Sequence, residues 1–332
     1  MAELLPLLAV RALTKHFTKR KSPVEWLMRV PPVSLKAVVD VSFEVARGET
    51  LGLIGESGCG KSTLGRTVLN LHRADGGSVS FDGTEISAMP EAAFRPYRRR
   101  MQIIFQDPYA SLNPRRSVAE IVGLPVRIHE GASARQAEER AAEFLPRVGL
   151  STEHLRRYPH QFSGGQRQRI GIARALILNP DFVVCDEPVS ALDVSIQAQI
   201  LELLTEFRQQ RGLTYLFISH DLAVVGRIAD RIAVMYLGQI VEIGPKQAIL
   251  DQPAHPYTRA LLAVAPRLKR RPGSERVALK GDLPSPLNPP NGCRFHTRCP
   301  VAKPICATLA PGITDLGAGH HVACHLHGGA GS

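Results

Sequence analysis

Residues 55–63 read Gly-Glu-Ser-Gly-Cys-Gly-Lys-Ser-Thr and match the pattern G-x-x-x-x-G-K-[ST]. The apolar run TLGLI precedes this stretch, and TLGRTVLNL, which suits a helix, continues from it. In a strand, loop and helix of this order, backbone N–H groups and the helix N-terminus converge on phosphate oxygens. Lys61 adds positive charge for the outer phosphates, and the hydroxyl of Ser62 can bind Mg²⁺. The predicted phosphate-binding residues are Gly55, Ser57, Gly58, Cys59, Gly60, Lys61, Ser62 and Thr63.

Apolar runs typical of buried strands recur around this loop, at TLGLIG, QIIFQD, FVVCDE and LTYLFISHD. Helical spacing fills most of the gaps between them. In VSIQAQILELLTEF, apolar side chains fall at i, i+4, i+7, i+8 and i+11, and Gly212 is the expected stop. Short buried strands that alternate with helices predict a largely parallel sheet in an α/β domain. From about residue 108 to 180 the strand signal almost vanishes, which predicts a helical subdomain inserted into that domain.

The apolar run that starts at Phe182 ends in two acids, Asp186 and Glu187. Ligands bind at the carboxyl ends of strands in α/β sheets, so these acids are expected near bound phosphates. Asp186 can hold Mg²⁺, directly or through water, and Glu187 can polarise an attacking water. Taken alone, two adjacent acids at the end of a strand could simply be exposed to solvent without a role. Their occurrence in the same chain as a phosphate loop favours a role in binding Mg²⁺ and activating water. Cys185 is interpreted as a small, buried apolar residue.

The composition is that of a folded, basic protein. The chain has 332 residues, about two domains' worth, and 41 Lys and Arg against 30 Asp and Glu give a net charge of +11. This balance favours polyanionic partners such as nucleotides, nucleic acid or an anionic membrane face. No run approaches the ~18 apolar residues that span a bilayer, and the N-terminus lacks the features of an export signal. The sequence therefore predicts a cytoplasmic chain with no membrane anchor of its own.

Further segments resemble the motifs of the ATP-binding-cassette (ABC) ATPases, in the order of that family. Gln106 resembles the Q-loop glutamine, Phe162-Ser163-Gly164-Gly165-Gln166 the signature, Ser190-Ala-Leu-Asp193 the D-loop, and His220 the switch histidine. The resemblance implies a P-loop α/β fold with a RecA-like core, an antiparallel β subdomain and an inserted helical subdomain. It also implies that two cassettes face head-to-tail, with each ATP between one phosphate loop and the other subunit's signature. The residues agree, because Ser163 and two glycines open a predicted helix whose N–H groups form a second anion cradle.

The resemblance also implies roles for single residues. Glu187, His220 and Gln106 would be catalytic: Gln106 senses magnesium and water, and His220 contacts the γ-phosphate and holds the attacking water with Glu187. Mg²⁺ would be held by Ser62, Gln106 and Asp186, and ATP would also be contacted by Ser163, Gly164, Gly165, Gln166 and Asp193. The adenine-stacking aromatic should lie on an early strand. Phe17 is the candidate, and Trp26, in the basic, proline-bearing stretch 19–32, is the weaker one.

Nearly the whole chain resembles one branch of the family, the ATPases of oligopeptide and dipeptide importers, with nickel importers as near relatives. The segments that carry this likeness are IFQDPYASLNPR, DEPVSALDVSIQAQIL, HPYTRALLAVAPR and GDLPSPLNPPNGCRFHTRCP, and the likeness is greatest to the F-type subunit. It implies an ATP hydrolase at the cytoplasmic face of the bacterial inner membrane. The implied partners are a D-type sister ATPase, two transmembrane permeases and, indirectly, a substrate-binding protein, but no nucleic acid. The expected domains are an ABC ATPase domain at 8–245 and an importer-type C-terminal extension at 246–332.

Other functions compete with this interpretation. An importer ATPase for nickel or another small solute would carry the same motifs. A soluble cassette ATPase acting on nucleic acid or ribosomes would suit the net charge of +11, although such chains usually carry two phosphate loops and this one carries one. A regulatory subunit that does not hydrolyse ATP is disfavoured because Glu187 and the signature are intact.

Cys293, Cys299, Cys306 and Cys324 are clustered near the end of the chain, with the spacing C-x5-C-x6-C-x17-C. In a reducing compartment such clustering indicates metal more readily than disulfides. The tail resembles the cysteine-rich region of this branch, in which some members carry an iron–sulfur cluster. Thiolates suit a [4Fe–4S] cluster or tetrahedral zinc, and the lack of a tight C-x2-C pair favours the cluster; four reduced structural cysteines are the alternative. Residues 281–327 hold few large apolar side chains, so this tail is expected to be ordered only by docking on a partner or by an internal crosslink.

Overall fold

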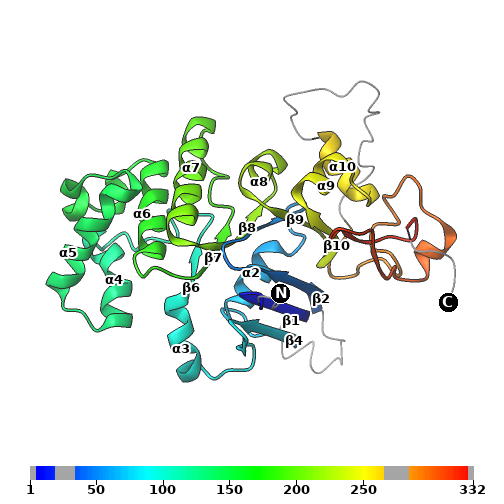
Figure 1. Cartoon of the computed structure of the whole chain (residues 1–332), viewed down its shortest axis with the longest axis horizontal. Helices are drawn as coiled ribbons and strands as arrows, with labels where there is room; N and C mark the ends of the chain where they lie inside the picture. The colour runs from blue at the N-terminus through cyan, green and yellow to red at the C-terminus, as the bar shows by residue number, and fades with distance from the viewer. Residues whose placement is uncertain (1–4, 19–33, 265–283, 328–332) are drawn as a thin grey trace, which may run out of the picture. The chain divides into compact units, whose positions relative to one another are not determined.

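The structure, a computed structural model, describes residues 5–18, 34–264 and 284–327 (Figure 1). Trp26 and the stretch 19–32 lie outside the described residues. The chain divides into two compact units, which we treat one at a time. Of the described residues, the carboxylate unit comprises 5–7, 45–50 and 88–219, and the phosphate-loop unit comprises 8–18, 34–44, 51–87, 220–264 and 284–327.

The carboxylate unit is built on parallel strands. Its elements are α3 (Glu91–Arg100), β6 (Met101–Ile104), α4 (Val118–Glu130), α5 (Ala134–Phe144), η1 (Leu145–Val148), η2 (Thr152–Arg156), η3 (Pro159–Gln161), α6 (Gly164–Leu176), β7 (Phe182–Asp186), α7 (Val194–Arg211) and β8 (Thr214–Ser219). Strand β7 pairs in parallel with β6 on one side and with β8 on the other. Every residue of β7 and β8 is buried, which explains their uninterrupted apolar runs. The predicted parallel α/β arrangement is confirmed.

Helices replace strands in the middle of this unit. Between β6 and β7, a stretch described throughout, α4, α5 and α6 occur and no strand does (green in Figure 1). Each helix begins with a capping box, in which an N-cap serine and a Glu or Gln three residues later exchange hydrogen bonds: Ser117 with Glu120, Ser133 with Gln136, and Ser163 with Gln166. Helix α7 ends at the predicted Gly212, whose φ of 64° suits a residue without Cβ.

The phosphate-loop unit contains two sheets. Its elements are β1 (Leu8–Thr18), β2 (Ser34–Val45), β3 (Thr50–Ile54), α2 (Lys61–Val68), β4 (Gly76–Phe81), β5 (Thr84–Glu85), α8 (Leu222–Ile228), β9 (Arg231–Tyr236), β10 (Gln239–Pro245), α9 (Lys246–Asp251), α10 (Pro256–Val264), η4 (Pro304–Ala307), β11 (Ile313–Asp315) and β12 (His321–Ala323). One sheet has the order β2-β1-β4-β5, and the β1–β4 and β4–β5 pairs are antiparallel. In the other, β9 lies between β3, its parallel neighbour, and β10, its antiparallel neighbour.

The cysteine-rich tail is more regular than the sequence predicts. Strand β12 pairs with β10, with Val322 opposite Glu242 and His321 opposite Ile243, and β11 adds to its other side. Phe295 from the same tail is 1% exposed, and its ring lies 5.3 Å from that of Tyr236. The edge of β10 supplies backbone partners that let three-residue strands form, and strands this short leave no periodic pattern. The tail is therefore ordered by docking on its own unit, a route that differs from both the partner and the crosslink expected from the sequence.

Within the ranges that the structure describes, no helix combines the length and the apolar character needed to cross a bilayer.

Candidate nucleotide site

The phosphate loop joins β3 to α2, and its shape depends on glycine. At Gly60, which has a φ of 110°, an added Cβ would lie 2.1 Å from the carbonyl oxygen of Ala37. At Gly55, a Cβ would lie 2.2 Å from the carbonyl oxygen of Met235. No side chain fits at either position, so the loop can close into a nest of backbone N–H groups. This cradle is what bound phosphates require, and the residues present fit the triphosphate of ATP.

Lys61 lies within the loop that it serves. Its side chain is buried, and Nζ donates hydrogen bonds to the carbonyl oxygens of Gly55 at 2.8 Å and Glu56 at 3.0 Å. Ser62 and Thr63 follow in the first turn of α2, whose backbone N–H groups point toward the N-terminal end of the helix. The ammonium group and these N–H groups give this end of the helix positive character, which favours an anion.

The two predicted acids differ in exposure. Asp186, at the end of β7, is 1% exposed, whereas Glu187 is half-buried. The backbone of Glu187 is left-handed, with a φ of 48°, and its N–H donates to the carbonyl oxygen of Ile218 at 3.0 Å. Gln106 Nε2 donates to Glu187 Oε2 at 2.9 Å, although the two residues are 81 positions apart. The structure thus brings together two of the three residues predicted to be catalytic.

The signature residues open helix α6. Ser163 Oγ accepts from the N–H of Gln166 at 3.3 Å, and Gln166 Oε1 accepts from the N–H of Ser163 at 3.1 Å. Gly165 is needed for close packing, because a Cβ there would lie 2.7 Å from Cγ2 of Ile196. The serine is exposed, and Gly164 and Gly165 carry no side chain that would cover the first turn. An anion can therefore approach this helix end.

The remaining predicted residues lie at exposed positions of their own elements. Asp193 is exposed at the N-terminus of α7, and His220 is exposed directly after β8. The ring of Phe17, at the end of β1, is 37% exposed. It makes an edge contact with His72 at 5.3 Å, and Lys15 Nζ lies 5.3 Å from its centroid. Phe17 therefore presents part of an aromatic face, as a stacking residue must, and its role stays a prediction.

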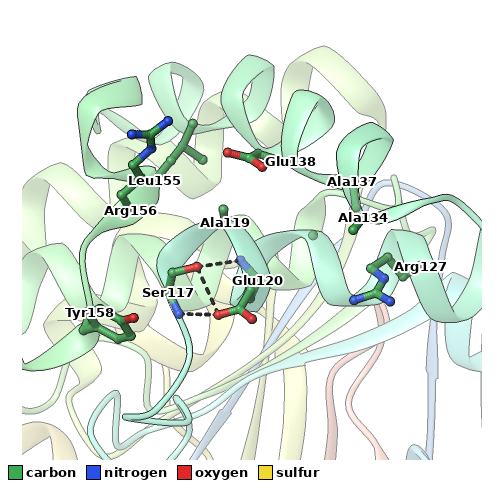
Figure 2. A pocket seen from close by; sticks show the side chains of 11 residues that line it. Ser117, Ala119, Glu120, Arg127, Ala134, Ala137, Glu138, Leu155, Arg156 and Tyr158 are labelled. Carbon is green, nitrogen blue, oxygen red and sulfur yellow. Dashed lines mark hydrogen bonds between the residues drawn. The ribbon is translucent and has the colours of Figure 1, made fainter.

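Figure 2 shows a different pocket, of about 300 Å³, within the carboxylate unit. It lies among α4, α5 and η2, and charged side chains from Glu120, Arg127, Glu138 and Arg156 line it. Ser117 and Glu120, the capping box of α4, form one of its walls. None of the predicted nucleotide-binding residues borders it. This pocket is not the predicted site.

The structure does not support the predicted metal site in the tail. No group of three or more His, Cys, Asp or Glu side chains within the described parts of the chain is arranged to hold a metal ion. Cys293, Cys299, Cys306 and Cys324 are free. Burial raises the pKa of the Cys293 thiol to about 11, and the neighbouring Cys306, Cys324 and Cys299 act in the same direction. The loops are closed instead by backbone contacts, such as Cys293 N–H to the Cys306 carbonyl oxygen at 2.8 Å.

Glu56, a residue of the phosphate loop, was not predicted from the sequence to have a role. Glu56 accepts two hydrogen bonds from Arg298, at 2.8 and 3.1 Å, across 242 positions of the chain. No local pattern marks either residue, so the pair could be found only in three dimensions.

Comparisons with known proteins agree with this geometry. The family described as "ABC transporter" matches residues 38–190, and "Oligopeptide/dipeptide transporter, C-terminal region" matches residues 241–306. The oligopeptide transport ATP-binding protein AppF of Bacillus subtilis (strain 168) is 51% identical over 325 residues, 97% of each chain. A dimeric ATP-binding cassette, MJ0796, solved in a post-hydrolysis state with ADP and Pi, has a TM-score of 0.63 at 27% identity, covering 72% of this chain and 98% of that one.

A second solved structure, cbiO1 from Clostridium perfringens, has a TM-score of 0.62 at 24% identity, covering 74% of this chain and 91% of its own, and supports the fold alone. The fold similarity and the two family matches lead to the same assignment as the glycine cradle and the paired acids. Given 51% identity to a relative over 97% of both chains, this chain belongs to the ATP-binding proteins of ABC transporters, in the branch that carries the oligopeptide/dipeptide transporter C-terminal region.

Proposed function

We propose that this chain is the ATP-binding and ATP-hydrolysing subunit of an importer of dipeptides or oligopeptides. The observation that carries the proposal is the likeness of the whole chain, phosphate loop and C-terminal region together, to a protein named for oligopeptide transport. ATP with Mg²⁺ is the proposed substrate. Neither a nickel importer nor a soluble ATPase acting on nucleic acid has an observation of its own in its favour.

The proposed chemistry uses the geometry of both units. Lys61 and the glycine cradle bind the phosphates, and Ser62, Gln106 and Asp186 hold Mg²⁺. Glu187 polarises the water that attacks the γ-phosphate, and the hydrogen bond from Gln106 supports this role because it fixes the carboxylate. His220 contacts the γ-phosphate, Asp193 lies in the D-loop, and Phe17 stacks on adenine.

The proposed assembly is a head-to-tail pair of ATPases. Ser163 is exposed and the first turn of α6 is open, so an anion can bind there. In the head-to-tail arrangement, that anion would be the ATP held by the sister subunit's phosphate loop. We propose a sister ATPase as the second cassette, two permeases that carry the pair at the cytoplasmic face of the membrane, and a substrate-binding protein that acts through them. The ATPase domain is proposed to span 8–245, which contains the first family match at 38–190. The extension is proposed to span 246–332, and the second family match, 241–306, begins five residues before it.

The test is transport by a reconstituted complex. The chain, a sister ATPase and two permeases would be purified together, placed in vesicles and supplied with the binding protein. We expect ATP-dependent uptake of a labelled tripeptide or pentapeptide, lost in Lys61→Ala and kept in the exposed control Lys36→Ala. Uptake of Ni²⁺ in place of peptide, or ATP hydrolysis stimulated by RNA alone, would contradict the proposal.

The same preparation, made without oxygen, tests the tail. Iron and sulfide in equal amounts, with visible absorption, would restore the predicted [4Fe–4S] cluster, and stoichiometric zinc alone would favour the alternative. A preparation that contained neither iron nor zinc would agree with the finding that the described residues form no metal-binding group.

A further inference from the structure

Glu56, the second residue of the phosphate loop, is held at each of its polar groups. Its backbone N–H donates to Tyr257 Oη at 2.9 Å, and its carbonyl oxygen accepts from Lys61 Nζ at 3.0 Å. Its carboxylate accepts from Arg298 in a two-pronged contact, Nη1 to Oε2 at 2.8 Å and Nη2 to Oε1 at 3.1 Å. The loop residue is therefore fixed from three directions, and two of the three partners come from beyond residue 245.

The partners are themselves held firmly. The side chain of Arg298 is 7% exposed and that of Glu56 is 23% exposed, so the pair is largely shielded from water. Tyr257 and Tyr236 pack against each other with ring centroids 4.7 Å apart, and Phe295 lies 5.4 Å from Tyr257. This aromatic cluster sets the position of the tail segment that carries Arg298. A fixed, shielded and bidentate contact is the kind of ion pair that contributes specificity of position as well as energy.

We infer that Arg298 and Tyr257 are positioning residues for ATP, which hold the phosphate loop in its binding shape and neutralise the carboxylate of Glu56. The inference rests on the proposed function, since it concerns the binding of the same nucleotide. It assigns to the C-terminal extension a part in nucleotide affinity, in addition to any contact with partners.

Two physical effects lead to this expectation. A carboxylate within the loop that binds phosphate would repel a polyanion, and in a shielded site this repulsion is weakly screened. Arg298 removes that repulsion by pairing with the charge. The carbonyl of Glu56 also orients the Lys61 ammonium, so a shift of Glu56 would move the positive charge intended for the outer phosphates.

The experiment measures binding of mant-ATP, a fluorescent ATP analogue, with Mg²⁺ to the full chain at low and high salt. We expect Arg298→Gln to weaken binding roughly tenfold, as suits the loss of a bidentate charged contact, with a smaller loss at high salt. The affinity of Arg298→Lys should lie between those of Arg298→Gln and the unmodified chain, because lysine keeps the positive charge but cannot make the two-pronged contact of a guanidinium. Tyr257→Phe, which keeps the ring, should weaken binding about threefold, as suits the loss of one neutral hydrogen bond.

The decisive variant is the double substitution Glu56→Gln, Arg298→Gln. It removes both charges, so affinity should return to within about threefold of the unmodified chain. Arg259→Gln, an exposed arginine on α10 that bonds the carbonyl of Pro253, is the matched control and should bind normally. A merely structural role for Arg298 would lower the unfolding temperature of the double variant as well, without restoring affinity.

Unchanged mant-ATP affinity in Arg298→Gln, equal losses in Arg298→Gln and Arg259→Gln, or no recovery in the double variant would overturn the inference. Failure of the proposed function looks different. In that case the unmodified chain itself would not bind mant-ATP in a manner that depends on Lys61, as measured with Lys61→Ala.

Discussion

Glu187 adopts a left-handed backbone, with a φ of 48°, at the point where β7 ends. Residues other than glycine seldom adopt this conformation, and it costs of order 1–3 kcal/mol unless the surroundings hold it. Here the N–H of Glu187 bonds to the carbonyl oxygen of Ile218, and its carboxylate bonds to Gln106. Strain of this kind, held by specific contacts, is typical of functional sites. It supports a catalytic role for Glu187 independently of the motif.

Glu187→Gln provides the sharpest test at this scale. The substitution keeps the size of the side chain but removes the negative charge that polarises water, so ATP turnover should fall by about 100-fold or more. Binding of mant-ATP should persist, because Lys61 and the glycine cradle are unchanged. Phosphate release by the assembled complex and fluorescence titration of the chain give the two readouts.

Glu202→Gln, on the exposed face of α7, is the control and should hydrolyse ATP normally. Near-normal turnover in Glu187→Gln would remove Glu187 from its proposed role.

Functional residues could be predicted where the pattern that marks them is local in the sequence, and not where the two partners lie far apart along the chain. Asp186 and Glu187 stand out because an apolar strand ends in two acids, and Lys61 because its loop is a local pattern. The pair of Glu56 and Arg298 spans 242 positions and has no local signature, so sequence reasoning missed it. The metal site stays a prediction without support from the described residues, because spacing places four cysteines near one another in sequence but does not fix how their side chains point.

A buried histidine directly precedes helix α10. His255 is 1% exposed, and its Nδ1 accepts a hydrogen bond from the N–H of Tyr257 at 3.0 Å. Glu242 of β10 accepts from the N–H groups of Ala254 at 2.7 Å and His255 at 2.9 Å, and from His320 Nε2 at 2.8 Å. The carboxylate ties the start of α10 and the turn before β12 to one strand. The extension is thus joined to the sheet through buried polar contacts.

Acid should weaken this junction. Burial, together with the nearby His327 and Arg259, lowers the pKa of His255 to about 3, whereas this histidine in the unfolded chain has a pKa of about 6.5. Between these values the unfolded state binds more protons, so stability falls as the pH falls below about 6.5. From pH 7 to pH 5 the loss from this residue is about 2 kcal/mol. Urea unfolding of the full chain, followed by the fluorescence of its aromatic residues, measures it.

His255→Asn keeps an acceptor near the position of Nδ1 and should remove that share of the pH dependence. Glu242, His320, His327 and Arg259 face the same site and remain in the variant, so any residual slope belongs to them. Exposed His160→Asn is the control and should leave the slope unchanged. Equal slopes in His255→Asn and the unmodified chain would contradict the assignment.

Elements with several turns or several buried positions were predicted well. In α7 the predicted apolar face comprised Ile196, Ile200, Leu203, Leu204 and Phe207. The last four are buried, Ile196 is half-buried, and Gly212 ends the helix. Strands β11 and β12 are three residues long and depend on pairing with β10, so composition alone indicated an irregular tail. A periodic pattern of apolar residues indicates an element that has a buried face along its length. It does not indicate a short strand that forms only because a neighbouring strand pairs with it.

At the scale of the whole molecule, the residues predicted to bind and hydrolyse nucleotide belong to two different units of the chain. The phosphate loop, Phe17 and His220 belong to one, while Gln106, the signature and both acids belong to the other. The order of motifs along the sequence was enough to identify the family, since that order is independent of how the units fold. In the proposed pair of cassettes, the signature of each chain would complete the ATP site of the other.

Ser163→Arg tests that partnership. A bulky cation at the N-cap of α6 should block the second anion cradle, so hydrolysis at the site completed by the sister's phosphate loop should fall about 100-fold. Binding of mant-ATP to the isolated chain should not change, because its own Lys61 site is untouched. Single-turnover hydrolysis with a sister subunit defective in its own signature separates the two sites.

Ser151→Arg is the matched control, since Ser151 is likewise an exposed N-cap serine. If Ser163→Arg altered only the binding of ATP to this chain's own Lys61 site, the head-to-tail arrangement would be wrong.

The contact between Arg298 and Glu56 bears on how such chains can be recombined. The two family descriptions match separate stretches, 38–190 and 241–306, which invites treating them as exchangeable modules. Yet a chain shortened to end at residue 245 would lose Tyr257 and Arg298 together, and with them two of the three groups that hold Glu56. A chimera that joins this cassette to a foreign tail therefore has to match tail and loop as a pair, or carry glutamine at position 56.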